Sequence, residues 1–348
     1  MTSKVPAVLL SELTTLHLGG PAGAVVDAAT EAELVGAVRE LDAAGEPTLV
    51  LAGGSNVVVA DAGFPGTVVR AVTRGVARDA ARVEVAAGES WDALVERCVA
   101  DGLSGVECLS GIPGSVGATP IQNVGAYGQE VAETITGVRA LDRRSGEIVS
   151  LAPTDCAFAY RSSAFKRDPG HWLVLAVEFA LEPSGASARV RYAELARTLG
   201  VELGDRAPLD AVREAVLSLR RGKGMVLDPC DPDTVSAGSF FTNPVLDPDA
   251  FAAFEARAGA PPPRWQEEGQ VKTSAAWLIE RAGFTKGYGD PEGIAISSKH
   301  TLALTNRGAG TTAQLVALAR EIAARVHDRF GVDIVPEPVF VGHSWDGV

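Results

Sequence analysis

The chain has 348 residues, of which 46% are hydrophobic and 22% charged, as is typical of a globular protein with two or three domains. The formal net charge of −13 excludes a general nucleic-acid-binding surface, so an anionic ligand would be held by a few local cations and helix N-termini. No apolar run reaches the roughly 20 residues of a membrane span, and the first residues lack the apolar region of a signal peptide, which predicts a cytoplasmic protein without membrane insertion.

Hydrophobic periodicity and turn residues predict alternating strands and helices along the chain. In the first half, strands are expected at 24–28, 67–71 and 82–87, helices at 30–44 and 90–102, and a strand, a glycine-rich turn and a second strand within 47–61. Thr30 and Glu33 form a capping-box pattern at the first helix, and Ser90 is the expected cap of the second. In the second half, strands are expected at 137–142, 147–151, 172–181 and 301–305, and helices at 207–223, 273–283 and 312–329.

Two glycine-rich segments stand out, "AGGSN" at 52–56 and "SGIPGSVGATPIQNVGAYGQE" at 110–130. Glycines allow positive φ and close approach of a ligand to the main chain, and successive N–H groups at such turns bind anions. Neither segment fits the Rossmann or P-loop pattern. Gly53 and Gly54 by themselves fit a hairpin turn equally well, whereas the two segments together favour a cradle for a diphosphate.

A third unusual segment is "SAGSFFTNP" at 236–244, in which a serine lies between small residues and two phenylalanines. A serine nucleophile normally needs a histidine base, but none of the five histidines lies in a G-x-S-x-G motif. Ser239 therefore has either a chemical role other than nucleophilic attack or a purely structural role, as a serine that stabilises its turn.

These segments, in this order, resemble UDP-N-acetylenolpyruvoylglucosamine reductase, a bacterial flavoenzyme family of peptidoglycan precursor synthesis. The resemblance also rests on "YRSSAFK" (160–166), "KTSAAWLIERAG" (272–283) and "PEP" (336–338), and it covers nearly the whole chain. It implies an α+β fold, with a two-lobed FAD-binding domain of the vanillyl-alcohol-oxidase (PCMH) type followed by a C-terminal α/β substrate-binding domain. The expected parts are 1–75 for the first lobe, 76–222 for the second lobe with a substrate loop near 183–205, and 223–348 for the substrate domain.

The resemblance implies non-covalent FAD, NADPH as reductant and UDP-N-acetylglucosamine enolpyruvate as substrate. We expect a monomer without nucleic-acid partners. Residues of both glycine-rich segments would hold FAD: Gly53, Gly54, Ser55, Asn56, Pro113, Gly114, Ser115, Gly117, Asn123, Gly125 and Tyr127. Hydride delivery to the alkene creates negative charge on the adjacent carbon and its carboxylate, which needs a cation or hydrogen-bond donors and a proton.

Three residues resemble the catalytic groups of the family. Ser239 would give the proton, Arg161 would face the substrate carboxylate with its guanidinium fork, and Glu337 would stabilise the enolate, for which it needs a raised pKa or a hydrogen-bond partner. Each of the three residues could instead have a non-catalytic role: Ser239 as a turn residue, Arg161 in a surface salt bridge and Glu337 as a solvated loop residue. Ser162 replaces the usual aspartate after Arg161, and the arginine that can follow the Pro-Glu pair is missing.

Further residues match the family's substrate contacts by position, namely Tyr160, Tyr192, Lys223, Asn243 and His300. Tyr192 lies in a loop that the longer subclass of the family has, and both Tyr192 and His300 are equally compatible with ordinary packing or surface positions. Lys272 is expected either to support the site or only to begin a helix.

Two other functions stay open at this point. A covalent flavin oxidase would need a tether, but no histidine lies between His17 and His171, and Cys108 is the only thiol near a glycine-rich segment. A non-catalytic nucleotide-binding protein would not need all three catalytic motifs. Cys98, Cys108, Cys156 and Cys230 form no CxxC pair and suit no metal site, so we expect buried free thiols and no metal.

Overall fold

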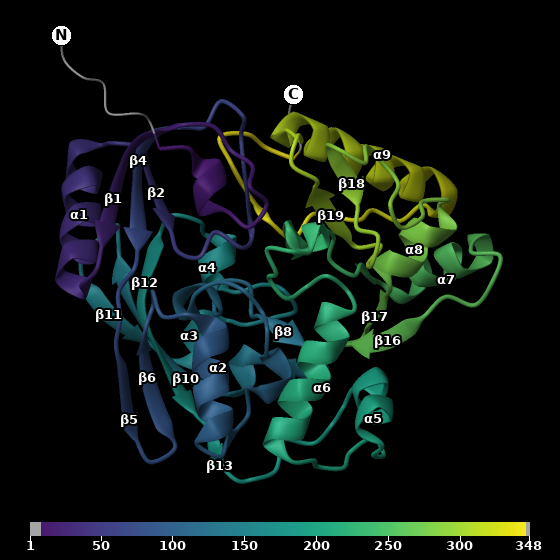
Figure 1. Ribbon diagram of the computed structural model, residues 1–348, viewed down its shortest axis with the longest axis horizontal. Helices are drawn as coiled ribbons and strands as arrows, with labels where there is room; N and C mark the ends of the chain where they lie inside the picture. Colours follow the sequence, from purple (N-terminus) through teal and green to yellow (C-terminus); the bar gives the residue numbers. More distant parts are fainter. Residues whose placement is uncertain (1–7, 346–348) are drawn as a thin grey trace. The chain divides into compact units, whose positions relative to one another are not determined.

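The computed structural model describes residues 8–345, which form two compact units (Figure 1). The first unit contains Val8 and the segments 22–54 and 65–222, and the second contains 9–21, 55–64 and 223–345. Within the described part of the chain, no helix combines the length and the apolar character needed to cross a membrane.

A three-stranded sheet in the first unit has the order β1 (Ala22–Ala28), β4 (Phe64–Ala71), β2 (Thr48–Leu51), and β2 and β4 run parallel. Helix α1 (Glu31–Ala44) begins at the predicted capping box of Thr30 and Glu33. Its buried residues Leu34 and Val38 join a core cluster that also contains Val69 of β4.

A five-stranded antiparallel sheet forms the larger part of the first unit. Its order is β11 (Ile148–Leu151), β10 (Ile135–Asp142), β12 (Trp172–Ala180), β6 (Arg82–Ala86) and β5 (Val76–Asp79). Helix α2 (Trp91–Ala100) packs Trp91 and Val95 into a cluster with Phe179 of β12. Two short ribbons pair β7 (Leu103–Ser104) with β13 (Glu182–Pro183) and β8 (Gly125–Ala126) with β9 (Gln129–Glu130).

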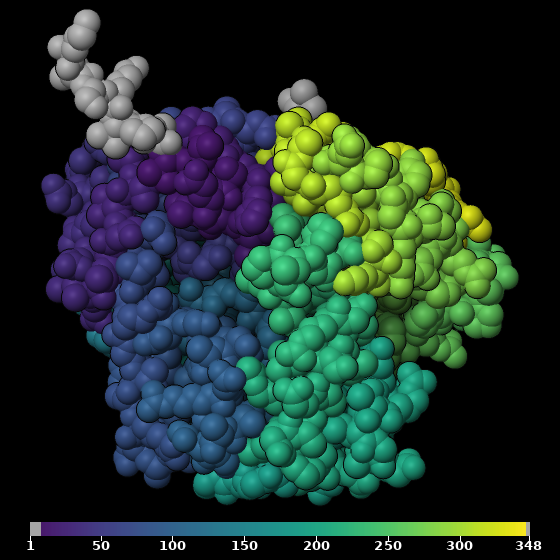
Figure 2. All heavy atoms as spheres, viewed as in Figure 1, coloured from purple at the N-terminus to yellow at the C-terminus, as the bar shows by residue number. Residues whose placement is uncertain are grey.

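Four further helices complete the first unit: α3 (Pro153–Cys156), α4 (Ala164–Arg167), α5 (Ala193–Leu199) and α6 (Leu209–Arg221). Helices α5 and α6 share a core of their own around Leu195, Val212 and Val216. Because the opposite side of α6 carries charged residues, that side lies at the molecular surface, where Figure 2 shows it in green.

The second unit has two three-stranded antiparallel sheets and one parallel strand pair. The first sheet has the order β14 (Ser236–Ser239), β19 (Ala303–Asn306), β18 (Ile294–Ile296). The second sheet has the order β15 (Val245–Leu246), β17 (Gln270–Thr273), β16 (Arg264–Glu267). Strand β20 (Val339–Val341) runs parallel to β3 (Val57–Val59), which joins the end of the chain to the segment after "AGGSN".

Helices α7 (Pro248–Arg257), α8 (Ala275–Arg281) and α9 (Thr312–Phe330) surround an aromatic core in this unit. Its fully buried rings include Phe240, Phe254, Phe284 and Phe330. Helix α9 begins at a capping box of Thr311 and Gln314, and the carboxylate of Asp61 accepts from the N–H groups of Thr312 (2.8 Å) and Ala313 (2.9 Å). Short 3-10 turns occur at Leu10–Leu13, Glu107–Leu109, Val116–Ala118, Val131–Glu133 and Pro232–Thr234.

Two sequence expectations are wrong in detail. Ser90 occupies the N-cap position of α2, but its side chain makes no capping hydrogen bond, and its backbone instead bridges to Ser115. Of the four free cysteines, Cys98, Cys108 and Cys156 are buried as expected, but Cys230 is exposed. Cys230 lies in a surface turn in which its N–H donates to the Asp228 carboxylate, and this turn keeps the residue out of the core.

Candidate active site

Gly53 of the first glycine-rich segment and Gly114 of the second lie in close contact within the first unit. A methyl group added at Gly53 would lie 2.7 Å from the Cα atom of Gly114, so only glycine allows this approach of one backbone to the other. Gly54 and Gly114 both have positive φ, at 60° and 113°. The alternative of a simple hairpin at 52–56 is wrong, because β2 pairs with β4 and β3 pairs with β20, and β2 and β3 do not pair with each other.

The second glycine-rich segment is fixed by its backbone to the start of α2. Trp91 N–H donates to the carbonyl of Gly114 (3.0 Å), and Gly117 N–H donates to the carbonyl of Ala87 (2.9 Å). A methyl group at Gly117 would lie 2.5 Å from the Ala87 Cβ atom, so this glycine serves close packing. These contacts hold small residues of both segments next to each other, around Gly53 and Gly114.

Asn123 holds the later part of this segment together. The residue is buried and has φ of 47°, a left-handed conformation that asparagine tolerates. Its Nδ2 donates to Glu130 (2.7 Å) and to the carbonyl of Ala159 (3.1 Å), and its Oδ1 accepts from Ala132 N–H (3.2 Å). Asn123 therefore joins the glycine-rich segment to the loop that precedes Arg161.

Arg161 lies against that same segment. Its Nη2 donates to the carbonyl of Gly125 (2.6 Å) and its Nη1 to the carbonyl of Asn123 (3.4 Å), while the guanidinium lies 5.2 Å from the ring centroid of Tyr160. The backbone of Arg161 has φ of 52°, a conformation that costs energy for a side chain of this size. The guanidinium thus has a fixed position beside the predicted FAD-binding residues.

Ser162 and Tyr192 also have structural contacts in this unit. Ser162 accepts a hydrogen bond from Arg167 Nη1 (3.0 Å) and forms a backbone bridge with Ala159, so the residue that replaces aspartate stabilises the loop. The ring of Tyr192 packs edge-on against Tyr127 with centroids 5.4 Å apart, although Tyr192 is 41% exposed. The segment with Tyr192 is thereby placed on the second glycine-rich segment.

The segments that contain Ser239 and Glu337 are joined in the second unit. Ser239 ends β14, directly before the buried rings of Phe240 and Phe241. Phe240 N–H donates to the carbonyl of Leu302 (2.7 Å), and Glu337 N–H donates to the carbonyl of Phe240 (2.8 Å). The buried phenylalanines anchor the segment, Ser239 is half-buried, and the backbone of Glu337 lies against the residue that follows Ser239.

The remaining predicted residues of this unit lie on short connecting segments. Asn243 Oδ1 accepts from Ala275 N–H (3.0 Å) at the start of α8, and His300 N–H donates to Ser297 Oγ (3.2 Å). Lys223 follows Gly222, the C-cap residue of α6. The carbonyl of Asn56 accepts from Val339 N–H (3.0 Å), and the carbonyl of Ser55 accepts from Thr15 Oγ1 (3.4 Å). Lys272 forms an ion pair with Glu267.

The structure therefore brings together two groups of predicted residues, one in each unit. In the first unit, Gly53, the second glycine-rich segment, Tyr160 and Arg161 are connected. In the second unit, the segments with Ser239 and Glu337 are connected through Phe240. Sequence reasoning missed the residues that hold these groups, such as Glu130 for Asn123 and Asp233 near His300. Among residues 8–345, no group of three histidine, cysteine or acidic side chains could hold a metal ion.

Comparison with known proteins identifies the family. Residues 22–152 match the model of an FAD binding domain, and residues 230–341 match the C-terminal domain of UDP-N-acetylenolpyruvoylglucosamine reductase. The UDP-N-acetylenolpyruvoylglucosamine reductase of Streptomyces coelicolor is 60% identical, with 96% of this chain and 89% of that protein covered. The one from Thermobifida fusca is 55% identical, with 98% and 99% covered.

A solved structure agrees with the sequence comparison. The UDP-N-acetylenolpyruvylglucosamine reductase (MurB) of Thermus caldophilus matches 97% of this chain and 99% of its own, with a TM-score of 0.66 and 26% identity. The predicted α+β class, the FAD-binding domain followed by a reductase C-terminal domain, and FAD as cofactor are confirmed. The chain belongs to the UDP-N-acetylenolpyruvoylglucosamine reductase family.

Proposed function

We propose that the chain uses NADPH and FAD to reduce UDP-N-acetylglucosamine enolpyruvate to UDP-N-acetylmuramate, with Ser239 as proton donor. The observation that supports this proposal is the hydrogen bond from Glu337 N–H to the carbonyl of Phe240, which brings the backbone of Glu337 next to the residue that follows Ser239. The family and the FAD-binding domain support the reaction class.

The backbone cradle at Gly53, Gly54 and Gly114 would hold the FAD diphosphate, with the other predicted cofactor-binding residues of both segments around it. When bound, FAD supplies the hydride chemistry between the nicotinamide and the terminal alkene carbon of the substrate. The protein's own task is to place the substrate, to stabilise the charge that develops and to provide a proton.

Ser239 would give the proton of its Oγ to the carbon next to the substrate carboxylate. A hydroxyl is a weak acid, but the carbanion is a strong base, so the serine needs no histidine. Glu337 would stabilise the enolate by a hydrogen bond from its protonated carboxyl or through a partner.

Arg161 would bind the substrate carboxylate. A guanidinium presents several donors in a plane, and the carbonyls of Gly125 and Asn123 already fix the orientation of that plane. We further propose that Tyr160, Tyr192, Lys223, Asn243 and His300 contact the substrate and that the chain acts as a monomer in the cytoplasm. Its four cysteines are free, in keeping with a reducing compartment.

A covalent flavin oxidase is the second candidate, and the state of Cys108 counts against it. Burial raises the pKa of the Cys108 thiol, and the nearby Glu107 carboxylate raises it further. A thiolate is therefore disfavoured at the one cysteine near a glycine-rich segment. Denaturation of the purified protein would release FAD if the cofactor is non-covalent, whereas a mass increase of the denatured chain would support the oxidase.

An anaerobic stopped-flow experiment in two steps tests the proposal. NADPH should bleach the visible flavin absorption, and UDP-N-acetylglucosamine enolpyruvate should then restore it rapidly without oxygen. Bleaching that is reversed only by air would contradict the proposed acceptor. A protein that takes up no FAD on reconstitution would contradict the cradle as well.

A further inference from the structure

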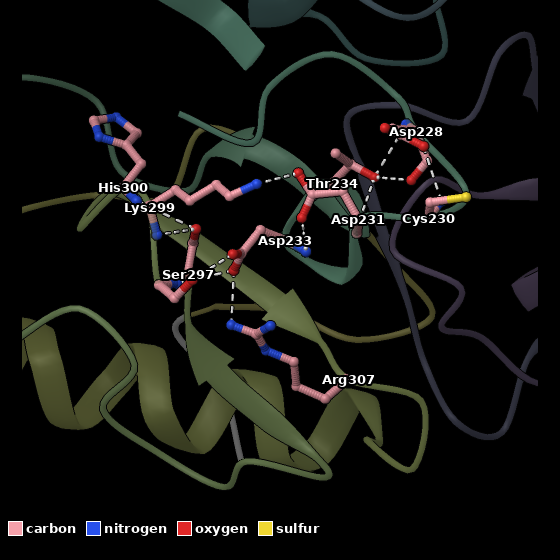
Figure 3. Close-up of polar contacts among 10 residues, drawn as sticks. Asp228, Cys230, Asp231, Asp233, Thr234, Ser297, Lys299, His300 and Arg307 are labelled. Carbon is pink, nitrogen blue, oxygen red and sulfur yellow. Dashed lines mark hydrogen bonds and ion pairs between the residues drawn. The ribbon is translucent and has the colours of Figure 1, made fainter. Parts of the chain in front are cut away.

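An acidic turn between Lys223 and Ser239 has contacts that the proposed reaction does not explain. The turn runs from Asp228 to Thr234 and is shown in Figure 3. Thr234 Oγ1 closes it by donating to the carbonyls of Asp228 (2.9 Å) and Asp231 (2.8 Å). The turn holds Asp233 in a buried position only six residues before Ser239.

Asp233 is a buried carboxylate with donors on both oxygens. The residue is 3% exposed. Its Oδ1 accepts from Ser298 N–H (2.9 Å) and Arg307 Nη2 (2.7 Å), and its Oδ2 accepts from Ser298 Oγ (2.5 Å). Burial alone would raise the pKa of this carboxyl, but the bonds from Ser298 and Ser297 and the charge of Arg307 lower it overall. Asp233 is therefore charged, and its partners offset the cost of burying it.

The first of three segments that pack against Asp233 contains Lys223 and Gly224. Gly224 has φ of 65°, and a methyl group there would lie 2.9 Å from the Asp233 Cβ atom. The backbone directly after Lys223 therefore packs against Asp233. Since only a residue without a Cβ atom fits this approach, the segment with Lys223 packs directly on the turn that holds Asp233.

The second segment is the one with His300. Ser298 bonds to Asp233, and Ser297 Oγ accepts from the N–H groups of Lys299 (3.0 Å) and His300 (3.2 Å). Lys299 Nζ also binds Asp231 (2.6 Å) in the same turn. The His300 ring points away from the cluster in Figure 3, so the contacts fix its backbone and leave the imidazole directed outward.

The third segment is the strand pair with Ser239. Arg307 directly follows β19, which pairs with β14 through Ser236 opposite Thr305 and Ser239 opposite Ala303. Asn306 N–H also donates to the carbonyl of Val235 (3.0 Å). The bond between Arg307 and Asp233 thus fixes the end of β19 relative to the start of β14.

From these contacts we infer that Asp233 is a positioning residue for substrate binding, which holds Lys223 and His300 in place relative to Ser239. The inference rests on the proposed function, in which those three residues meet the substrate. Asp233 itself touches neither the substrate nor the flavin. Its loss should therefore weaken binding of the UDP substrate and leave the reaction of the flavin with NADPH intact.

Asp233→Asn tests the inference, with Asp228→Asn as the matched control. Both variants remove one carboxylate from the same turn, but Asp228 is exposed and bonds only within the turn. For Asp233→Asn we expect the KM for the UDP substrate to rise about tenfold or more, with an unchanged rate of flavin reduction by NADPH and an unchanged flavin spectrum. Asp228→Asn should keep all three values. If Asp233→Asn lowers only the melting temperature, or slows flavin reduction as much as turnover, the inference is wrong.

Ser298→Ala provides a second test should Asp233→Asn not fold, because it removes one donor and keeps the backbone bond. It should show the same pattern with a smaller rise in KM, and an unchanged KM would contradict the inference. Calorimetric binding of UDP-N-acetylmuramate separates this inference from the proposed function. Wild-type binding that weakens about tenfold in Asp233→Asn supports the inference even if turnover is absent, and equal binding by both proteins contradicts it. No binding by the wild type would overturn both.

Discussion

The backbone N–H of Glu337 donates a 2.8 Å hydrogen bond to the carbonyl oxygen of Phe240, the residue that follows Ser239. The adjacent pair, Phe241 and Pro336, forms a backbone bridge, so two segments almost 100 residues apart are connected at this point. Because the bond to Phe240 uses the backbone of Glu337, its side chain can be changed without breaking the connection.

Glu337→Gln is therefore expected to fold normally and to reduce the substrate about 10²- to 10³-fold more slowly, since a carboxyl group that stabilises the developing charge is lost. Flavin reduction by NADPH should keep its rate. The measurement is the pair of half-reaction rates by stopped flow, with Asp333→Asn, an exposed acidic position of the same unit, as control. A Gln variant with the wild-type rate of reoxidation would remove Glu337 from the chemistry.

Arg161→Lys should not replace the arginine, because an ammonium cannot reproduce the planar contacts with the carbonyls of Gly125 and Asn123. We expect kcat/KM for the UDP substrate to fall roughly 10²-fold. Arg191→Lys is the matched control, since Arg191 forms an exposed ion pair with Glu133. Near-normal turnover by Arg161→Lys would count against a contact with the substrate carboxylate.

Gly53→Ala should weaken FAD binding, because the new methyl group would lie 2.7 Å from the Gly114 Cα atom and would push the two glycine-rich segments apart. The measurement is the flavin content after purification and the apparent Kd on reconstitution. Gly36→Ala is the control, since no atom lies within 4 Å of the added group and the helix should gain about 0.5–1 kcal/mol of stability. Equal flavin affinity in both variants would contradict the cradle.

Asp92 links α2 to the second glycine-rich segment and to α6. Its carboxylate accepts from Gly111 N–H (2.6 Å) and from Arg213 (2.7 and 3.1 Å). Burial raises the pKa of Asp92, but the bonds from Arg213 and Gly111 outweigh it and lower the pKa below the ordinary value. The stabilisation is thus present above the ordinary pKa of aspartate and is lost as the pH falls through the lowered value.

Asp92→Asn should lower the free energy of unfolding by about 1.5–3 kcal/mol at pH 7, and the difference from the wild type should shrink under acid conditions. Denaturant titrations at several pH values measure this difference. A difference that does not change with pH would show that the charge of Asp92 is not its source.

Local sequence signals predicted much of this fold. The capping boxes at Thr30 and Thr311 involve residues three positions apart, so the sequence alone reveals them. The sequence does not predict the β16–β17 hairpin. It does not predict helix α5 either, because α5 is short and its stability comes from packing against α6. The exposure of Cys230 was not predicted either, because it depends on the fold of the acidic turn from Asp228 to Thr234.

The candidate site was predicted mainly from its motifs, and the contacts that hold it were not. Asp233 has its partners at Ser298 and Arg307, more than 60 residues later in the chain, and no spacing rule connects them. Asn123 and Ala159 are 36 residues apart, and no spacing rule connects them either. The boundary between two lobes at residue 75 stays a prediction. The separate roles of the cofactor-binding and substrate-binding residues also stay predictions.

The most direct test of the account is the rate of each half-reaction in Ser239→Ala. After anaerobic reduction by NADPH, the variant is mixed with UDP-N-acetylglucosamine enolpyruvate, and the return of the flavin absorption is followed. We expect flavin reduction at nearly the wild-type rate and reoxidation about 10²- to 10⁴-fold slower, because only the second step needs the proton of Ser239. Reoxidation at the wild-type rate, or equal slowing of both steps, would contradict the assignment of Ser239 as the proton donor.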